Sequence, residues 1–425
     1  MAKTTNNNSN VLGIIFLITV FVAAFLIGNI EENNSYFLLL LLLVIGFGAY
    51  YSNRFGSTIV TICRVIIGLL FIFSGTVKGI DPVGTAYRIE DYFIAYGTDW
   101  ANSLAMPLSV LLNATEFIIG VMLLFNIKMK LTSWLVMLMM AVFTFVTIND
   151  ALYNPVPDCG CFGDAIILSN WQTLYKNLVL DALVLVVFFT RNSSKRTFKP
   201  VVEWAIFLVF GLAFIFFEIY NIRHLPVVDF RNWKVGNKMV VENPLPLKYY
   251  LKYRNKETGE EKEYISPDYP YHDSVWLSKW EFVSQRIENP NPKLHDLYIE
   301  NLDGIDVTEQ VIQNTDLQFI LVSYDLKEGN WEKIDDVRQF IKSCDEDDHS
   351  FVVLTASFRE DIDEFEQGHA LNTDYCHADD IVLMSMIRSN PGLILMRDGV
   401  VLGKWHYNDF PFYDQVIREF ATPVE

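Results

Sequence analysis

Long apolar stretches fill the first 226 residues and give the first structural prediction. A helix needs about 20 apolar residues to cross the hydrocarbon core of a bilayer. Seven windows reach or approach that length, and the second is the shortest: 11–30, 36–51, 57–77, 106–126, 131–149, 171–190 and 201–221. The pattern predicts an α-helical membrane bundle of seven spans, the first being a retained span rather than a cleaved signal.

After residue 226 the hydrophobic pattern changes to short segments of alternating type. YYLKYRNKETGEEKEYI holds two β-rich runs around Glu257-Thr258-Gly259 and predicts a hairpin. Two later strands, two helices and a second hairpin are predicted in the order DLQFILVSYDL, EKIDDVRQFIKSC, SFVVLTAS, EDIDEFEQG and SNPGLILMRDGVVLGKW. This order predicts an α/β domain outside the bundle.

The two patterns divide the chain into five predicted parts. They are an N-terminal transmembrane hairpin (1–56), a four-helix membrane core (57–190), a last span with its linker (191–226), a β-rich connecting segment (227–310) and the α/β domain (311–425).

Lysine and arginine in the short connections predict the orientation, because they gather on the cytoplasmic side of a membrane. If the N-terminus is cytoplasmic, that side holds eight of them: Lys3, Arg54, Lys128, Lys130, Arg191, Lys195, Arg196 and Lys199. The opposite side holds Lys78 and Arg88, with Lys176 just inside a helix. We therefore expect a multi-pass inner-membrane protein whose residues 227–425 are periplasmic.

Formal charge differs sharply between the halves. Residues 1–226 carry 13 acidic and 13 basic side chains and are neutral overall. Residues 227–425 carry the other 38 acidic and 20 basic side chains, and therefore the whole net charge of -18. An acidic surface repels phosphate backbones, which excludes nucleic acid as an expected partner. The expected partners are the lipid bilayer and envelope proteins or their thiols.

Among the charged residues inside the predicted spans, we take three as functional candidates: Arg64, Glu116 and Asp181. A charge inside the bilayer is costly, so each is a functional candidate. Arg64 lies deep enough to partner either acid, which would lower that cost. We interpret the three as an intramembrane polar cluster that either holds the bundle together or takes part in proton or quinone chemistry.

The sharpest chemical signal is the loop NDALYNPVPDCGCFGDA between the fifth and sixth spans. A disulfide between Cys159 and Cys161 would close a small, strained ring, and strain raises a disulfide's reduction potential. The alternative is an inert pair in a tight turn. Asp158 and Asp164 are expected to raise the thiol pKa values. The loop contains no histidine, so no metal site is predicted.

RVIIGLLFIFSGTVKGIDP, NATEFIIGVMLLFN and DCGCFGD together resemble the DoxX and MauE (methylamine utilisation) group of four-helix membrane proteins over about residues 57–190. In that resemblance Arg64, Gly68, Ser74, Gly75 and Lys78 match the first core helix, Glu116 and Gly120 match the second, and the Cys-Gly-Cys loop is of MauE type. The group is linked with quinone-coupled oxidation and with maturation of disulfide-rich periplasmic enzymes. The resemblance implies no certain cofactor and leaves a quinone as a candidate.

The α/β domain is similar to thioredoxins in the order of its elements, and Asn390-Pro391 stands where that fold carries a cis-proline at its partner groove. It departs from them where a Cys-x-x-Cys should follow the first strand, because YDLKEGNWEKIDD has no cysteine. Cys344 and Cys376 remain, and we expect them to fill space or to bridge each other.

These observations favour membrane-linked thiol–disulfide redox exchange by Cys159 and Cys161, with a quinone as the candidate acceptor. The alternative is a non-enzymatic scaffold whose exterior domain binds envelope proteins. A metabolite carrier that uses Glu116 and Asp181 is a third and weaker hypothesis.

Overall fold

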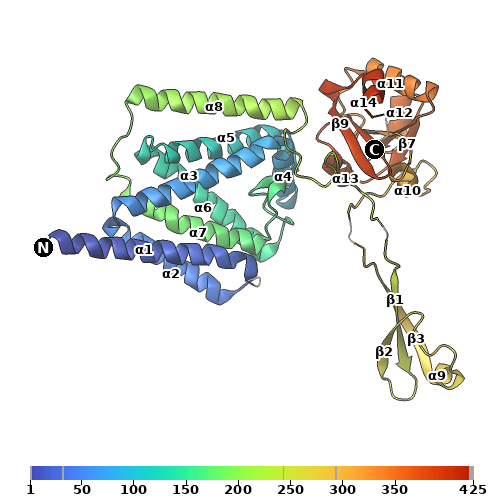
Figure 1. Cartoon of the computed structure of the whole chain (residues 1–425), viewed down its shortest axis with the longest axis horizontal. Helices are drawn as coiled ribbons and strands as arrows, with labels where there is room; N and C mark the ends of the chain where they lie inside the picture. Colours follow the sequence, from blue (N-terminus) through green and yellow to red (C-terminus); the bar gives the residue numbers. More distant parts are fainter. Residues whose placement is uncertain (1, 31–32, 243, 292–293, 421–425) are drawn as a thin grey trace. The chain divides into compact units, whose positions relative to one another are not determined.

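The computed structural model describes residues 2–30, 33–242, 244–291 and 294–420. The chain divides into two compact units, Met1–Arg231 and Asn232–Glu425. The first unit is helical, and the second contains the β-sheets (Figure 1).

The helices of the first unit follow the predicted apolar windows, with one addition. They are α1 (Ala2–Leu26), α2 (Ser35–Tyr51), α3 (Ser57–Ile80), α4 (Pro82–Ala95), α5 (Ala105–Leu124), α6 (Met129–Tyr153), α7 (Asn170–Thr190) and α8 (Pro200–Arg223). Within the described residues, all of these except α4 belong to the seven helical segments that are long and apolar enough to cross a membrane. The prediction of seven apolar helices of membrane-spanning length, as in a multi-pass membrane protein, is therefore confirmed.

Helix α7 forms the centre of the unit. Most of its side chains are buried, and α2, α3 and α6 pack around it. Its start is fixed by a capping box, in which the Ser169 hydroxyl accepts a hydrogen bond from the Gln172 amide while the Ser169 amide donates to the Gln172 side chain. This cap fixes the start of α7 and therefore the position of Lys176, which lies in the candidate site.

Helix α4 is absent from the sequence prediction because it is too short and too polar for a span. Its start follows ordinary rules: the Asp81 carboxylate accepts a hydrogen bond of 2.8 Å from the Gly84 amide, and Pro82 occupies the first turn. It packs against α5 and carries Arg88 and Tyr92.

The second unit contains two sheets. In the three-stranded sheet, β1 (Lys248–Asn255) pairs antiparallel with β2 (Glu261–Ile265) and with β3 (Trp280–Glu288). The first of these pairings confirms the predicted hairpin. The third strand and the short helix α9 (Ser274–Lys279) that precedes it were not predicted.

A six-stranded sheet has the order β4-β7-β6-β5-β8-β9. Its strands are β4 (Glu300–Asn301), β5 (Gln318–Val322), β6 (Ser350–Thr355), β7 (Asp374–His377), β8 (Gly392–Arg397) and β9 (Val400–His406). Strands β5, β6 and β7 run parallel, whereas β8 is antiparallel to β5 and β9.

Helices α11 (Ile334–Glu346), α12 (Arg359–His369) and α14 (Tyr413–Phe420) cover one face of this sheet through a common apolar core. The remaining helices are α10 (Thr308–Ile312) and α13 (Asp380–Met386). The predicted strands, helices and second hairpin of this α/β domain are confirmed, while β4, β7, α10, α13 and α14 are additions. The thioredoxin-like interpretation remains a prediction.

Candidate functional site

Helices α3 and α5 approach each other closely enough that glycine is required where they cross. A Cβ atom at Gly75 would lie 2.8 Å from the backbone nitrogen of Phe117, and one at Gly120 would lie 2.6 Å from that of Ile72. Small residues at a helix crossing let the backbones meet in a membrane. The crossing brings the α3 residues beside Gly75 against the α5 residue Glu116.

We expect Gly120→Ala to lower stability because the two helices must separate to admit the methyl group. Overpacking of this kind typically costs about 1–3 kcal/mol. The thermal midpoint of the detergent-solubilised protein measures the effect. Gly46→Ala in α2 is the matched control, since a Cβ there meets no atom within 4 Å. Equal midpoints for the two variants would contradict the close crossing.

A buried ion pair lies at this crossing. The Lys78 ammonium group contacts the Glu116 carboxylate, and the two residues are 5% and 1% exposed. The Ser74 hydroxyl lies 2.8 Å from Glu116 Oε2 and also 2.8 Å from the backbone oxygen of Cys161. It has one proton, so it donates to one of these oxygens at a time. Ser74 thus connects the ion pair to the loop that carries Cys159 and Cys161, which we call the cysteine loop.

Arg88 of α4 binds the cysteine loop through an ion pair. The guanidinium group of Arg88 forms an ion pair of 2.8 Å with Asp158, whose other oxygen accepts a hydrogen bond of 2.9 Å from the Gly160 amide. Gly160 has φ +63°, and a Cβ there would lie 2.8 Å from Arg88 Cγ. The middle position of the Cys-Gly-Cys sequence therefore requires glycine.

The two thiols of the loop lie side by side. The sulfurs of Cys159 and Cys161 are 3.2 Å apart and both residues are half-buried. The hydrogen bond between them lowers the pKa of Cys161, and the ammonium groups of Lys176 and Lys78 lower it further. The same hydrogen bond and burial raise the pKa of Cys159. These groups favour the thiolate at Cys161 and the protonated thiol at Cys159.

This electrostatic arrangement corrects the sequence prediction that Asp158 and Asp164 raise the pKa of both thiols. Asp158 is neutralised by Arg88. The charges acting on Cys161 are lysines from other helices, which sequence proximity did not reveal.

Tyr92 of α4 connects Cys159 to Asp150 near the end of α6. Its hydroxyl donates a hydrogen bond of 2.7 Å to Asp150 Oδ2 and also interacts with the Cys159 thiol. Burial and these two neighbours raise the pKa of Tyr92. Tyr92 therefore stays protonated at neutral pH.

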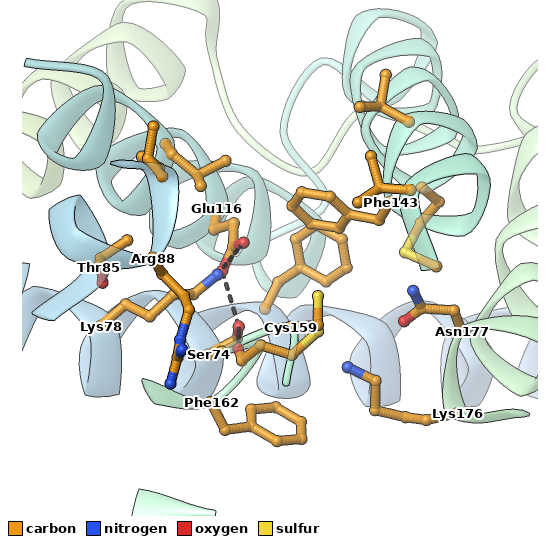
Figure 2. Close-up of a pocket in the computed structure, with 18 of the residues that line it drawn as sticks. Ser74, Lys78, Thr85, Arg88, Glu116, Phe143, Cys159, Phe162, Lys176 and Asn177 are labelled. Atoms are coloured by element: carbon orange, nitrogen blue, oxygen red, sulfur yellow. Dashed lines mark hydrogen bonds and ion pairs between the residues drawn. The ribbon is translucent and has the colours of Figure 1, made fainter. Parts of the chain in front are cut away.

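The thiols form part of the wall of a cavity of about 370 Å³. Its wall is mainly apolar, with polar groups at Ser74, Lys78, Thr85, Arg88, Glu116, Lys176 and Asn177. Figure 2 shows Cys159 and Lys176 pointing into the same space, with the contacts of Glu116 to Lys78 and Ser74 beside it. The Lys176 ammonium lies 4.6 Å from the ring centre of Phe162, another wall residue.

The structure does not bring Arg64, Glu116 and Asp181 into one cluster, which corrects that prediction. Arg64 donates to the backbone oxygens of Leu123 and Leu124 in the last turn of α5, the second at 3.1 Å. Asp181 accepts a hydrogen bond of 2.7 Å from Thr144. Arg64 lies ten residues before Ser74 in α3, or roughly 15 Å along the helix axis, so it is too far away to serve Glu116.

Sequence reasoning also missed charged groups that the structure buries. The predicted third span ended at residue 77 and left Lys78 in a loop, whereas α3 continues to Ile80. Glu203 and Glu218 lie in α8 and are 1% and 0% exposed. Their position inside the seventh apolar window was the signal that could have found them.

In the second unit, Asn390 and Pro391 are buried, and Asn390 contacts the loop after β5, where the predicted thioredoxin-like fold would carry Cys-x-x-Cys. The peptide bond between them is cis. The Asn390 side chain accepts a hydrogen bond of 2.7 Å from the Ser323 hydroxyl and donates one of 2.8 Å to the backbone oxygen of Asp325. Asn390 thus stabilises the cysteine-free loop, and the proposed partner groove gains no exposed side chain from this pair.

The remaining cysteines are free, buried thiols. Cys344 belongs to the apolar core that also contains Tyr375. Cys376 follows Tyr375 in β7 and therefore faces the other side of the sheet. A bridge between Cys344 and Cys376 is excluded by this arrangement. Cys63 is fully buried in α3.

Residues 56–190 match the family described as methylamine utilisation protein MauE. The matched segment includes Ser74, Lys78, Glu116 and both loop cysteines. Protein TlpB of Flavobacterium psychrophilum is 27% identical over 146 residues, which are 33% of this chain and 39% of TlpB. The chain thus spans about two fifths of the curated relative that it matches.

No solved structure matches the chain. The family match ends at residue 190, so α8 and the second unit lie beyond it, and α1 and α2 lie before it. This chain is therefore a multi-pass membrane protein in which residues 56–190 are similar to MauE.

Proposed function

We propose that this protein is a membrane thiol–disulfide oxidoreductase whose redox pair is Cys159 and Cys161. The observation that carries the proposal is the pair itself: two free sulfurs 3.2 Å apart at the wall of a largely apolar cavity between membrane helices. The thiolate is the reactive form of a cysteine, and Lys176 and Lys78 favour it at Cys161. An inert turn would not require these charges.

The oxidised pair would act on envelope protein thiols. A substrate thiolate attacks the disulfide and a second substrate thiol completes the exchange, so the substrate gains a disulfide and Cys159 and Cys161 become thiols. Two electrons and two protons must then leave the pair before another cycle. A quinone dissolved in the bilayer is the acceptor we propose, and it is released as the hydroquinone.

The cavity suits such an acceptor by size and lining. Its volume of about 370 Å³ falls within the range of small-molecule sites. Apolar side chains such as Leu70, Leu112 and Val146 supply most of its wall, and the Lys176 ammonium offers a hydrogen-bond donor to a quinone oxygen.

The location we propose is the inner membrane, with the loop and the second unit in the periplasm. The distribution of basic residues between connections supports this orientation. The similarity to MauE, in the group that the resemblance links with disulfide-rich periplasmic enzymes, supports the same role. The second unit would hold partners rather than exchange electrons, since Cys344 and Cys376 are both buried.

The scaffold is the second candidate function. It is favoured by the same feature of the second unit, a sheet domain whose expected dithiol position is a hydrogen-bonded loop without cysteine. In that case Cys159 and Cys161 would be a fixed structural pair.

Acid quenching of living cells, followed by maleimide alkylation of the denatured protein, distinguishes the two functions. We expect both redox forms of the loop pair, a shift to the reduced form when quinone synthesis is blocked, and loss of function in Cys159→Ser and Cys161→Ser. The control is Cys344→Ser with Cys376→Ser, which removes buried thiols only. A pair that never changes state, with function intact in the loop variants, would leave the scaffold as the function.

A further inference from the structure

The two thiols of the loop differ in what they must lose when a disulfide forms. The hydrogen bond between the two sulfurs and the positive charges of two lysines favour the thiolate at Cys161. Cys159 still carries a proton. When Cys161 has reacted with an acceptor, Cys159 must give up that proton to attack the Cys161 sulfur.

A route for this proton leads away from the cavity. The Tyr92 hydroxyl interacts with Cys159 on one side and donates a hydrogen bond of 2.7 Å to Asp150 Oδ2 on the other. Asp150 is fully buried, and its second oxygen, Oδ1, has no hydrogen-bond partner among the described residues. A buried carboxylate with one oxygen left unpaired can take up a proton there, which relieves the cost of the buried charge.

We propose that Asp150 is the proton acceptor for Cys159, with Tyr92 as the relay between them. This inference rests on the proposed redox role of the loop pair. As Cys159 attacks, its proton passes to the Tyr92 oxygen and the Tyr92 proton passes to Asp150. The Cys159–Cys161 bond forms, and the group that was bonded to Cys161 leaves with the electron pair. The balance is one proton on Asp150 and one leaving-group anion for each disulfide formed.

The other charged groups near this route have different roles. They are Cys161 and Asp158 in the loop, Arg88 in α4, Tyr96 just after α4, Lys78 in α3, Glu116 in α5 and Lys176 in α7. Asp158 and Glu116 are paired with Arg88 and Lys78, so neither is available as a base. Tyr96 is an exposed residue whose hydroxyl accepts a hydrogen bond from Asn149, so it is not part of the buried route.

The test uses the reduced full-length protein and the aromatic disulfide dithiobis(nitrobenzoate), whose released thiolate is coloured. The first release reports attack by Cys161, and the second reports attack by Cys159 on the mixed disulfide. Asp150→Asn keeps the size and the hydrogen bond from Tyr92 but cannot accept the proton. We expect it to leave the first phase unchanged and to slow the second by about 100-fold at neutral pH. The deficit should shrink as pH rises, since hydroxide then removes the Cys159 proton.

Tyr92→Phe should reproduce this profile and serves as the second variant if Asp150→Asn does not fold. The matched control is Asp181→Asn, which changes a membrane-embedded acid that contacts Thr144 and lies outside the cavity wall. A purely structural role for Asp150 would alter both phases or neither at every pH, and either outcome would overturn the proposal. Absence of the second phase in the unmodified protein would also overturn it. Failure of quinone-dependent cycling in cells, with the two-phase profile intact, would count against the proposed function alone.

Discussion

Replacing Lys78 by methionine should destabilise the protein by about 3–5 kcal/mol, the typical effect of removing one partner from a buried ion pair. The Glu116 carboxylate, 1% exposed, would keep only the Ser74 contact. Methionine has the same length as the uncharged part of the lysine chain, so the change removes mainly the ammonium group. The thermal midpoint and the yield of folded protein in detergent measure the loss.

The double variant Lys78→Met with Glu116→Leu separates charge from shape. Removing both partners leaves no uncompensated charge, so its stability should return close to that of the unmodified protein. The difference from the two single variants gives the coupling energy of the pair. Lys176→Met is the matched control, because Lys176 lines the same cavity but is only half-buried and forms no ion pair with a carboxylate among the residues that the structure describes. A Lys78→Met variant as stable as this control would contradict a stabilising ion pair between Lys78 and Glu116.

The helical unit was predictable because a membrane span is a property of one segment. About 20 apolar residues identify a span whatever its neighbours are, and all seven windows proved to be helices of that kind. The ion pair between Lys78 and Glu116 was not predictable in this way. It depends on the crossing of α3 and α5, and on one further turn of α3 that buries a lysine assigned to a loop.

Helix α4 shows a signal that was present but unused. Asp81 followed by Pro82 marks a helix start, and Ala86, Ile89 and Phe93 continue at helical spacing. Recognising it would have placed Arg88 and Tyr92 on one short helix facing the loop. The link from Tyr92 to Asp150 would still have been hidden, because it joins residues 58 positions apart.

The same distinction between local and non-local signals applies to the strands of the sheets. Strands with long apolar runs, such as Gln318–Val322, were predicted, since burial on both faces leaves a continuous apolar pattern. Strand β7 (Asp374–His377) is short and begins and ends with polar residues, so its sequence resembles a loop. Its pairing with β6 supplies the order that the local sequence lacks.

At neutral pH an alkylating reagent should modify Cys161 at least about tenfold faster than Cys159, which follows from a pKa difference of one unit or more. Three interactions determine which thiol has the lower pKa. The hydrogen bond with Cys159 and the positive charges of Lys176 and Lys78 all favour the Cys161 thiolate. Since only the thiolate reacts, the pH midpoint of Cys161 alkylation should lie below that of an ordinary thiol, and the midpoint of Cys159 above it.

Variants separate these contributions. Lys176→Gln removes a cation near the thiolate, so the Cys161 midpoint should move to higher pH. Cys159→Ala removes the hydrogen-bond donor and should raise the Cys161 midpoint more than Lys176→Gln does, because the hydrogen bond is the largest of the three causes. Cys159→Ser keeps a hydroxyl donor and should raise the midpoint less than Cys159→Ala. Lys199→Gln, which changes a lysine just before α8 that is exposed and absent from the cavity wall, is the charge-matched control. Mass spectrometry of the peptide after brief alkylation assigns the modified sulfur. Faster modification of Cys159, or a Cys161 midpoint unmoved by Lys176→Gln, would reverse the roles of the two thiols and leave the lysines of this cavity without a part in the exchange.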